Sequence, residues 1–493
     1  MSLSAPLSIT LAIVIPLIGA LFIGLSGKRP NLRETFTIVT ATLLFGLVCT
    51  LIEPVMAGEK LAMTWFEPLP GLPIAFDIEP LGLLFALVAS FLWIITTIYA
   101  IGYMRGHHEE NQTRFYICFA IAISSVMGVA LASNLLTLFV FYEILTLSTY
   151  PLVTHAGTDK AKQGGRVYLG ILISTSIAFF LFAIVATWSL AGTLDFRPGG
   201  ILSGTASPLV LGGLLILFSY GIGKAALMPF HRWLPSAMVA PTPVSALLHA
   251  VAVVKAGVFS VLKVAIYIFG IDELSTLVAS DVVLYIAAAT ILIASLVAMT
   301  KDNLKARLAY STISQLGYIV AGAMLATSAG IIGSAMHIAT HAFGKITLFF
   351  CAGAIMVACH KTEISQMRGL GRTMPFTMLA FLIGSISIIG LPPMGGTWSK
   401  WYLVMGSLEA EKMVLVFVLM ISSLLNIAYL LPIPIRGFFS ADPTQPAGPI
   451  KEAPLPSLIA LAVTSMGCLL LFFYPTPLYE LAASIPTSGD PDQ

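Results

Sequence analysis

Charged side chains are scarce in this sequence. Only 10% of its 493 residues are Asp, Glu, Lys or Arg, whereas 58% are hydrophobic. Soluble globular domains carry about 25% charged residues, so the composition excludes an ordinary soluble domain and indicates an integral membrane protein. A net charge of +2 does not indicate a nucleic-acid-binding surface. We therefore expect the chain to lie in a lipid bilayer and not to bind a nucleic acid.

Metal-ligand and nucleotide-binding motifs are also lacking. The sequence holds no CxxC pair, no histidine at ligand spacing from a cysteine, no GxGxxG turn after a strand and no P-loop. We therefore expect no metal, no cofactor and no catalytic residue in this chain, and energy would have to come from partner proteins or an ion gradient. The cysteines, all in or beside apolar stretches, are Cys49, Cys118, Cys351, Cys359 and Cys468.

Long apolar stretches dominate the rest of the sequence. About 20 apolar residues in a helix cross the ~30 Å hydrocarbon layer of a bilayer. We predict an all-α integral membrane protein with about fourteen transmembrane helices. The predicted spans are residues 6–25, 35–52, 81–104, 115–131, 134–153, 167–194, 208–227, 242–270, 282–300, 308–327, 329–358, 374–402, 413–435 and 456–476.

Basic residues favour alternate connections between these spans. Of the 25 Lys and Arg residues, seventeen fall in odd-numbered connections, three in even-numbered ones and five inside spans. Short cytoplasmic loops are enriched in basic residues, so the odd connections are predicted to face the cytoplasm of a bacterial inner membrane, with both termini extracytoplasmic. No basic residue precedes the first span, and Lys28 and Arg29 follow it. We therefore expect an uncleaved anchor and not a signal peptide.

Ionisable residues inside the predicted spans indicate ion or proton movement. Inserting a charged side chain at the bilayer centre costs about 3 kcal/mol or more of free energy. Such residues therefore usually face the protein interior or a water-filled cavity and have a function there. Two alternatives stay open. Glu143 is either a proton-transfer group or a neutral side chain held by packing, and Lys263 serves either an exit path or a membrane anchor. The residues concerned are Glu143, Lys224, Lys255, Lys263, Lys345 and Lys400.

Two spans are interrupted beside a buried lysine. After Lys224 the sequence AALMPFHRWLPSAMVAPTPVSALLHA contains four prolines, and GLPPMGG at residues 390–396 precedes Lys400. Proline removes a backbone donor and breaks a continuous helix, and carbonyls freed at this depth need protein or water as partners. Broken helices with ionisable residues form transport sites in membrane transporters. Ordinary proline kinks are the alternative.

Histidines add groups that titrate near neutral pH. His337, His341 and Lys345 are spaced at i, i+4 and i+8, so they share one helix face. We predict a proton relay through His341 and Lys345, with weaker support for His337 and for His249 on another span. Hydrogen-bonded packing histidines are the alternative. A carboxylate such as Glu143 that approaches a buried lysine stabilises its charged form, and withdrawal of the carboxylate favours proton release.

Three segments carry a family resemblance: FYEILTLSTYP, GKAALMPFHRWLPSAMVAPTPVSALLHAVAVVKAG and HIATHAFGKITLFFCAG. They resemble the antiporter-like subunits shared by respiratory complex I, membrane-bound hydrogenases and Mrp-type cation/proton antiporters. The resemblance covers nearly the whole chain. It implies two inverted five-helix repeats at residues 115–271 and 272–437, each with a broken helix. Three helices in residues 1–114 would precede them, and one helix with a tail in 438–493 would follow.

The resemblance also implies roles for the buried ionisable residues. Glu143 and Lys224 would form the coupled pair, and Lys255 would be the connecting lysine. His341 and Lys345 would form the central link, and Lys400 would be the terminal lysine. Possible accessory residues are His249, Lys263 and His337.

The identity of the complex is a finer question. The sequence ends soon after the fourteenth span, so we do not expect the extra C-terminal helices of the largest family members. TWSKW at Lys400 is typical of the Mrp D subunit, whereas one mid-sized complex I subunit generally has glutamate there. We expect the proton-translocating D subunit of a multisubunit sodium/proton antiporter. Other membrane subunits would be its partners, and any sodium site would lie in a partner or at its interface.

Two other functions remain as alternatives. A proton-pumping subunit of an NADH–quinone oxidoreductase or of a membrane-bound hydrogenase would use the same residues. A stand-alone carrier of an organic solute is disfavoured, because no span offers the acid–base pair or small-residue pocket that a polar solute needs.

Overall fold

Helices make up almost all of the chain. The computed structural model describes residues 4–440 and 449–487. Within those ranges, eleven helical runs are long and apolar enough to cross a membrane, which confirms an all-α membrane protein. They are α1 (Ala5–Leu25), α2 with α3 (Pro30–Cys49 and Ile52–Met56), α4 (Pro80–Gly106), α5 (Gln112–Ala130), α6 (Leu135–Val153), α7 to α8 (Asp159–Ala191), α11 to α12 with the π-helical turns beside them (Thr242–Phe269), α14 (Val278–Thr300), α16 (Ser328–Cys359), α20 with α21 (Met413–Phe439) and α22 (Leu455–Phe473).

The expected number of fourteen spans exceeds these eleven for a physical reason. α9 (Pro208–Gly221) and α18 (Pro375–Ile389) are shortened because each ends at one of the two proline-containing breaks. α15 (Leu304–Met324) has 21 residues but contains charged, hydroxyl and amide side chains. These three helices occupy the remaining predicted stretches, and their crossing of the bilayer stays a prediction.

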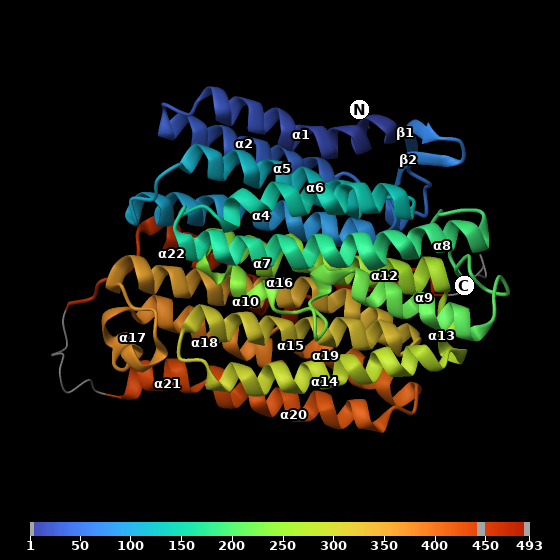
Figure 1. Cartoon of the computed structure of the whole chain (residues 1–493). Coiled ribbons are helices and arrows are strands. Elements are labelled where there is room, and N and C mark those ends of the chain that lie inside the picture. The colour runs from blue at the N-terminus through green and yellow to red at the C-terminus, as the bar shows by residue number, and fades with distance from the viewer. Residues whose placement is uncertain (1–3, 441–448, 488–493) are drawn as a thin grey trace.

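The connections between helices gather at two opposite ends of the molecule (Figure 1). A β-hairpin and α13 (Ile271–Thr276) lie at one end, whereas α17 (Leu370–Thr373) and α21 (Pro432–Phe439) lie at the other. The first two belong to even-numbered connections and the last two to odd-numbered ones. Even- and odd-numbered connections lie at opposite ends, as expected if successive helices cross the membrane in alternating directions.

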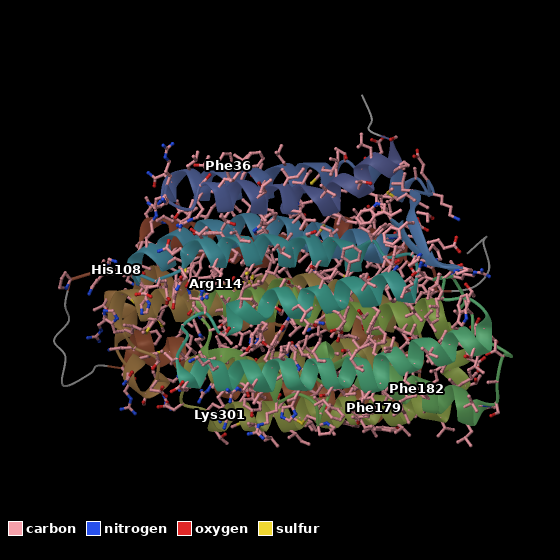
Figure 2. The ribbon with its side chains drawn as sticks, turned by 45° about the horizontal axis from the view of Figure 1, so that its top comes forward. Phe36, His108, Arg114, Phe179, Phe182 and Lys301 are labelled. Carbon is pink, nitrogen blue, oxygen red and sulfur yellow. The ribbon has the colours of Figure 1, made fainter. Side chains whose placement is uncertain are left out.

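We call the end with the odd connections the basic end and the opposite one the hairpin end. Figure 2 shows His108, Arg114 and Lys301 toward the basic end, and Phe179 and Phe182 along the flank. Phe182 is 59% exposed, which suits a flank that meets lipid or a partner subunit.

The sequence did not predict the β-hairpin. β1 (Ala62–Leu69) and β2 (Leu72–Asp77) pair antiparallel. The hairpin docks on the connection between α5 and α6, where the Asp77 N–H donates to the Leu131 carbonyl at 2.9 Å and Phe76 pairs with Ala132. Burial raises the pKa of the Asp77 carboxyl. The chain is thus all-α in its membrane part, with one small β element outside it.

Side-chain caps fix where two of the functional helices begin. The Asn134 side chain accepts a hydrogen bond at 2.8 Å from the backbone N–H three residues on, at the start of α6. Thr327 does the same at 3.1 Å at the start of α16. Such caps satisfy donors that the first helical turn leaves free. They therefore fix the register of the helices that carry Glu143 and His341.

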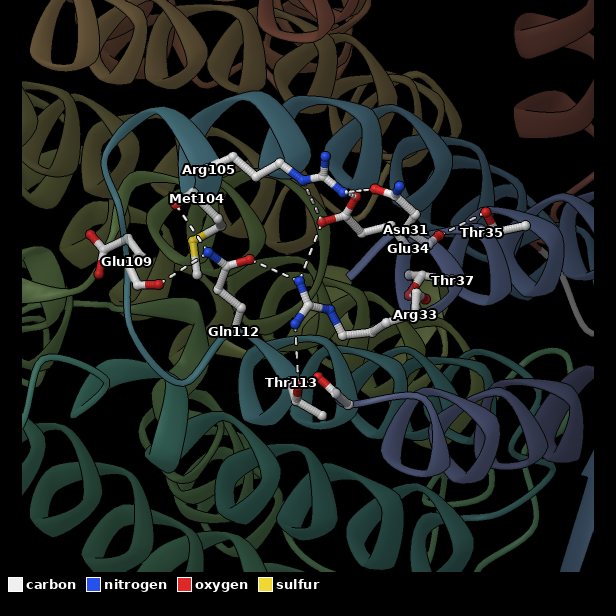
Figure 3. Close-up of polar contacts among 11 residues, drawn as sticks. Asn31, Arg33, Glu34, Thr35, Thr37, Met104, Arg105, Glu109, Gln112 and Thr113 are labelled. Atoms are coloured by element: carbon white, nitrogen blue, oxygen red, sulfur yellow. Dashed lines mark hydrogen bonds and ion pairs between the residues drawn. The ribbon is translucent and has the colours of Figure 1, made fainter. Parts of the chain in front are cut away.

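A partly buried polar cluster ties α2, α4 and α5 together at the basic end (Figure 3). Glu34 accepts two hydrogen bonds from the Arg105 guanidinium, at 3.1 and 2.5 Å. Arg33 donates to Gln112 Oε1 at 2.8 Å and to Thr113 Oγ1 at 3.2 Å. Buried charges persist when they are paired and hydrogen-bonded. Arg33 is one of the seventeen basic residues counted in the odd-numbered connections, and it therefore also holds helices together.

The expected orientation predicts a labelling result. Ser4 adjoins α1 at the hairpin end, where Thr10 of α1 contacts Met63 of β1. A Ser4→Cys variant should react with an impermeant thiol reagent added outside intact cells, because the hairpin end is expected to face outward. Lys301→Cys at the basic end should react only after permeabilisation. The reverse pattern would overturn the orientation. A second labelling position, Asp490, lies outside the described residues.

Candidate functional site

The first break leaves Lys224 at the end of a half-helix. α9 ends at Gly221, and after short turns the next long helical run begins at Thr242. The carbonyl of Gly223, freed by the break, accepts a hydrogen bond from the Trp233 indole at 3.0 Å. Lys224 thus follows the carboxyl end of a half-helix, where the helix dipole favours a cation.

Lys224 is fully buried and held by α6. Its Nζ donates to the Tyr142 carbonyl at 2.8 Å and to Thr146 Oγ1 at 2.6 Å, and it lies 3.1 Å from the centroid of the Tyr142 ring. A Cβ at Gly257 of α12 (Val253–Val264) would clash with the Lys224 backbone. The glycine therefore lets the helix of Lys255 pass directly against the break.

Glu143 lies beside this lysine without touching it. Both carboxylate oxygens are buried and have no hydrogen-bond partner among the described residues, Lys224 included. The two charges still interact electrostatically. The predicted coupling of Glu143 and Lys224 stays a prediction. Buried carboxylate oxygens are rarely left without partners, so a bridging water molecule or a movement of the Glu143 side chain toward Lys224 would satisfy them.

The central residues form a connected line. Lys255 Nζ and His341 Nδ1 lie 2.6 Å apart. The His341 ring is followed by the His337 ring at 5.7 Å between centroids, and His337 Nδ1 lies 2.9 Å from Ser399 Oγ. A hydrogen bond between two nitrogens needs one donor and one lone pair, so one of these two side chains donates a proton to the lone pair of the other.

His337 has a better position than the sequence suggested. Its ring stacks on Tyr318 at 5.6 Å, and the Nε2 atoms of both His337 and His341 have no protein partner among the residues that the structure describes. Water is needed to satisfy such buried atoms. The geometry therefore brings His337 into the line between Lys255 and Ser399, the residue next to Lys400.

Lys400 closes the line at the second break. α18 ends at Ile389, and α19 (Gly396–Glu409) begins after the glycine- and proline-containing segment. Lys400 Nζ donates to the Ile389 carbonyl at 2.9 Å and to Ser423 Oγ at 3.3 Å, and it lies 4.7 Å from the Tyr318 ring centroid. This lysine therefore also lies at the negative end of a half-helix.

Lys345 and His249 are buried but lie outside this line. Lys345 Nζ donates to the Leu308 carbonyl at 3.4 Å. The His249 ring packs tilted against Phe349, with 4.8 Å between centroids, and neither of its nitrogens has a partner among the described residues. Neither makes a hydrogen bond to another titratable side chain in the described part of the chain. Their predicted roles as central link and accessory group stay predictions.

Lys263 is buried inside the protein and paired with a carboxylate. Only 1% of it is exposed, and its Nζ pairs with Glu79 Oε1 at 2.9 Å. Glu79 also caps α4 and accepts from the Tyr267 hydroxyl at 2.8 Å. Sequence reasoning missed Glu79, because it precedes the predicted span by two residues. Its position before Pro80 at a helix start was the available signal.

The Lys263–Glu79 pair predicts a stability effect. Removing one partner of a buried ion pair costs about 3 kcal/mol, so Lys263→Met and Glu79→Gln should each lower the melting temperature of the purified protein in detergent, and the double variant should recover part of the loss. Lys412→Met is the matched control, because the Lys412–Asp281 pair (2.6 Å) is partly exposed and should be worth under about 1 kcal/mol. Equal effects at both pairs would contradict the assignment. Transport should fall less without Lys263 than without Lys224.

Several partners of the lysines were not found from the sequence. Tyr142 and Thr146 hold Lys224, and Tyr318 and Ser399 connect His337 to Lys400. Polar residues one helical turn from a buried charge were the available signal. Within the described ranges, no three His, Cys, Asp or Glu side chains converge to hold a metal ion.

Comparison with known proteins gives the family. Residues 132–426 match the family "NADH:quinone oxidoreductase/Mrp antiporter, TM", and residues 65–116 match "NADH-Ubiquinone oxidoreductase (complex I), chain 5 N-terminus". The chain is similar to NADH-quinone oxidoreductase subunit N of Desulforudis audaxviator, with 32% identity over 87% of this chain and 88% of the relative.

Longer relatives are matched over part of their length. Identity with NADH-quinone oxidoreductase subunit L of Escherichia coli is 30% over 81% of this chain and 66% of the relative. Identity with NAD(P)H-quinone oxidoreductase subunit 5 of Paulinella chromatophora is 32%, over 78% of this chain and 61% of the relative. The chain thus spans about three fifths of that relative.

Two solved structures share the fold over almost the whole chain. A chain of an archaeal membrane-bound sulfane sulfur reductase gives a TM-score of 0.86 at 23% identity, covering 98% of both chains. A chain of the Mrp complex from Dietzia gives 0.84 at 21% identity, covering 97% of both. The family match over residues 132–426 and the 32% identity with subunit N show that the chain belongs to the family of antiporter-like membrane subunits that NADH:quinone oxidoreductases and Mrp antiporters share.

Proposed function

We propose that this chain translocates protons as an antiporter-like membrane subunit of a larger complex. The observation that carries the proposal is the contact of 2.6 Å between Lys255 Nζ and His341 Nδ1 in a fully buried setting. A hydrogen bond between two basic nitrogens, placed between the two broken helices, has little structural use. It suits a group that accepts a proton from one side and passes it to the other.

Proton movement along the line follows from charge. When Glu143 approaches Lys224, the charged lysine is stabilised, and when the carboxylate withdraws, the lysine tends to release its proton. A proton arriving at Lys255 is shared with His341 and can continue through His337 and Ser399 to Lys400 by short hops and bridging water. Lys345 would act as a further charged group beside this line, and His249 as an accessory one.

The proposed architecture follows the family resemblance. Fourteen membrane helices would contain two inverted five-helix repeats at residues 115–271 and 272–437, each with one of the two breaks. Both termini would be extracytoplasmic in a bacterial inner membrane. The similar placement of Lys224 and Lys400 at half-helix ends supports this division.

For the complex, we propose a multisubunit sodium/proton antiporter with this chain as its D subunit. Lysine at position 400 and the Mrp-like fold support this setting. A quinone oxidoreductase is the second candidate, supported by the 32% identity with subunit N over 88% of that relative. Membrane-bound hydrogenase stays a variant of the second candidate. The stand-alone solute carrier has no support from the geometry.

Purification of the complex through a tag on this chain tests the setting. An antiporter should yield membrane subunits without flavin or iron–sulfur absorbance, and sodium addition should collapse an imposed pH gradient in vesicles that hold the complex. Co-purifying flavin and iron–sulfur subunits would favour the oxidoreductase.

The isolated chain is expected to show no sodium-dependent proton exchange in proteoliposomes. Sodium prefers several hard oxygen ligands, usually with a carboxylate, and Glu143 stands beside a row of positive groups. Saturable sodium-dependent exchange by the pure chain would contradict a sodium site in a partner.

A further inference from the structure

An apolar groove lies on the outer surface of the bundle between α18 and α22, which pack against each other. Its volume is about 490 Å³, and every residue of its described lining is hydrophobic except Ser465. Phe376 is 65% exposed and Leu455 is 69% exposed, so the groove belongs to the surface that meets lipid or a partner subunit. The lining includes Phe376, Leu379 and Ile383 on α18, and Leu455, Ile459 and Met466 on α22.

The groove runs along the helices from the basic end into the membrane layer. Phe376 is the second residue of α18, and Leu455 is the first residue of α22. The lining of α22 continues to Leu469, which corresponds to about 21 Å of helix. One leaflet supplies about half of the ~30 Å hydrocarbon layer. The groove is therefore long enough to follow an acyl chain through the whole leaflet at the basic end.

The size of the groove decides between an acyl chain and a helix as its occupant. A helix with its side chains is about 10 Å or more across, so 21 Å of helix fills roughly 1,600 Å³. This is more than three times the volume of the groove. A single hydrocarbon chain is much thinner and can lie along the groove. Such a chain would be held by van der Waals packing, which is what drives association inside a membrane.

Cationic side chains flank the mouth of the groove at the basic end. Arg372 and Lys451 are both exposed. The Lys451 N–H donates to the Thr373 carbonyl at 2.8 Å, so the segments that carry the two cations lie side by side. Thr373 follows Arg372 directly and precedes Phe376 by three residues. The apolar groove therefore opens next to two positive charges.

A carboxylate at the mouth, Glu452, is engaged by the start of α18. It accepts hydrogen bonds from the Phe376 N–H at 2.7 Å, from the Thr377 N–H at 3.3 Å and from the Thr377 hydroxyl at 2.5 Å. The amino end of a helix stabilises such an anion. The Glu452 charge is thus compensated locally, and the surroundings of the mouth stay positive.

Lys361 adds a third positive charge near the mouth. The Cys359 thiol donates to the Met374 sulfur at 3.6 Å, just before α18 begins. Cys359 also interacts electrostatically with both Lys361 and Lys451, so the two lysines approach the same point. Basic groups between membrane helices on the cytoplasmic side bind the headgroups of anionic lipids. The charges and the groove together therefore match both parts of one such lipid.

We propose that the groove between α18 and α22 binds an acyl chain of an anionic phospholipid whose phosphate lies against Arg372 and Lys451. The lipid comes from the leaflet at the basic end, because both helices begin there. Arginine contacts a phosphate through two parallel N–H groups, and lysine contacts it as a point charge. The site is independent of the proposed proton translocation and adds a lipid ligand to the chain.

The proposed site borders the second break. The Cys468 carbonyl of α22 accepts from the Gly395 N–H at 2.8 Å, and the Phe472 carbonyl accepts from the Trp398 indole at 2.9 Å. α22 therefore holds the segment that follows the break, while α18 leads into it. A lipid chain between the two helices would support their packing beside Lys400.

Photolabelling of the assembled complex tests the acyl-chain site. Phosphatidylglycerol with a photoreactive group midway along one chain would be mixed into phosphatidylcholine proteoliposomes, and labelled peptides would be mapped by mass spectrometry. Label should concentrate in α18 and α22. Ala462→Trp fills the groove from an exposed lining position and should lower this labelling at least about fivefold. Ala289→Trp, at an exposed position of α14 outside the lining, is the matched control and should leave the labelling unchanged.

Two results would overturn the acyl-chain site. One is unchanged labelling of α18 and α22 in the Ala462→Trp complex. The other is labelling of the two helices no stronger than that of other lipid-facing helices, which is also the result expected if a partner subunit covers the groove in the complex.

Removal of charge tests the headgroup site. Each basic residue near the membrane surface strengthens binding of anionic lipid about fivefold, so Arg372→Gln combined with Lys451→Gln should weaken the apparent affinity for the phosphatidylglycerol probe about 25-fold. Lys160→Gln combined with Lys162→Gln removes the same charge from exposed positions of α7 and should leave the affinity unchanged. A phosphatidylcholine probe with the same chains should label the unmodified groove more weakly. Equal labelling by the two probes, or unchanged affinity in the Arg372 and Lys451 double variant, would overturn the proposal of an anionic lipid.

Discussion

Replacing Lys224 by alanine should lower proton transport by the assembled complex at least about 100-fold, because removal of a positioned proton-transfer group commonly costs this much in rate. Lys224 is the lysine of the first break, and it interacts electrostatically with Glu143. Flux would be recorded with a pH-sensitive dye in proteoliposomes at equal amounts of assembled complex.

Two further variants and a control make this result specific. Glu143→Ala and Lys400→Ala should show a similar loss with assembly intact. Lys412→Ala, which removes a partly exposed lysine outside the line, should keep near-normal flux. Near-normal exchange by the Glu143 or Lys224 variant would refute the proposed switch.

Replacing His341 by alanine should have the second large effect, again about 100-fold, because it removes the partner of Lys255 and opens a gap before His337. His337→Ala should also reduce flux, because the His337 ring lies between His341 and Ser399, with its Nδ1 2.9 Å from Ser399 Oγ. His108→Ala in a loop at the basic end serves as the control. Full activity of the His341 variant would show that protons bypass this histidine.

The sequence predicted the buried charges because their chemistry is local. Lysine inside an apolar stretch is conspicuous by composition, and the prolines after Lys224 and before Lys400 forbid a continuous helix. The breaks at Gly221 and Ile389 lie where these residues indicated. Such features need no knowledge of which helices become neighbours.

The contacts could not be predicted because they join distant segments. Lys255 meets His341, 86 residues away, and Lys263 meets Glu79, 184 residues away by their numbers. Lys263 was expected to serve as an anchor or an exit group, yet a carboxylate at the start of α4 holds it inside the protein. The groove between α18 and α22 was not predicted either, because neither helix forms it alone.

Proton flux through the assembled complex with Lys255→Ala tests the central claim most directly, because Lys255 is the residue that we propose connects the first break to the histidines and the second break. The complex would be reconstituted, a pH gradient imposed, and the initial rate compared with that of the unmodified complex and of protein-free liposomes. The account predicts that the variant, assembled to the same extent, falls to the rate of protein-free liposomes. A rate within about twofold of the unmodified complex would contradict proton movement along the buried row.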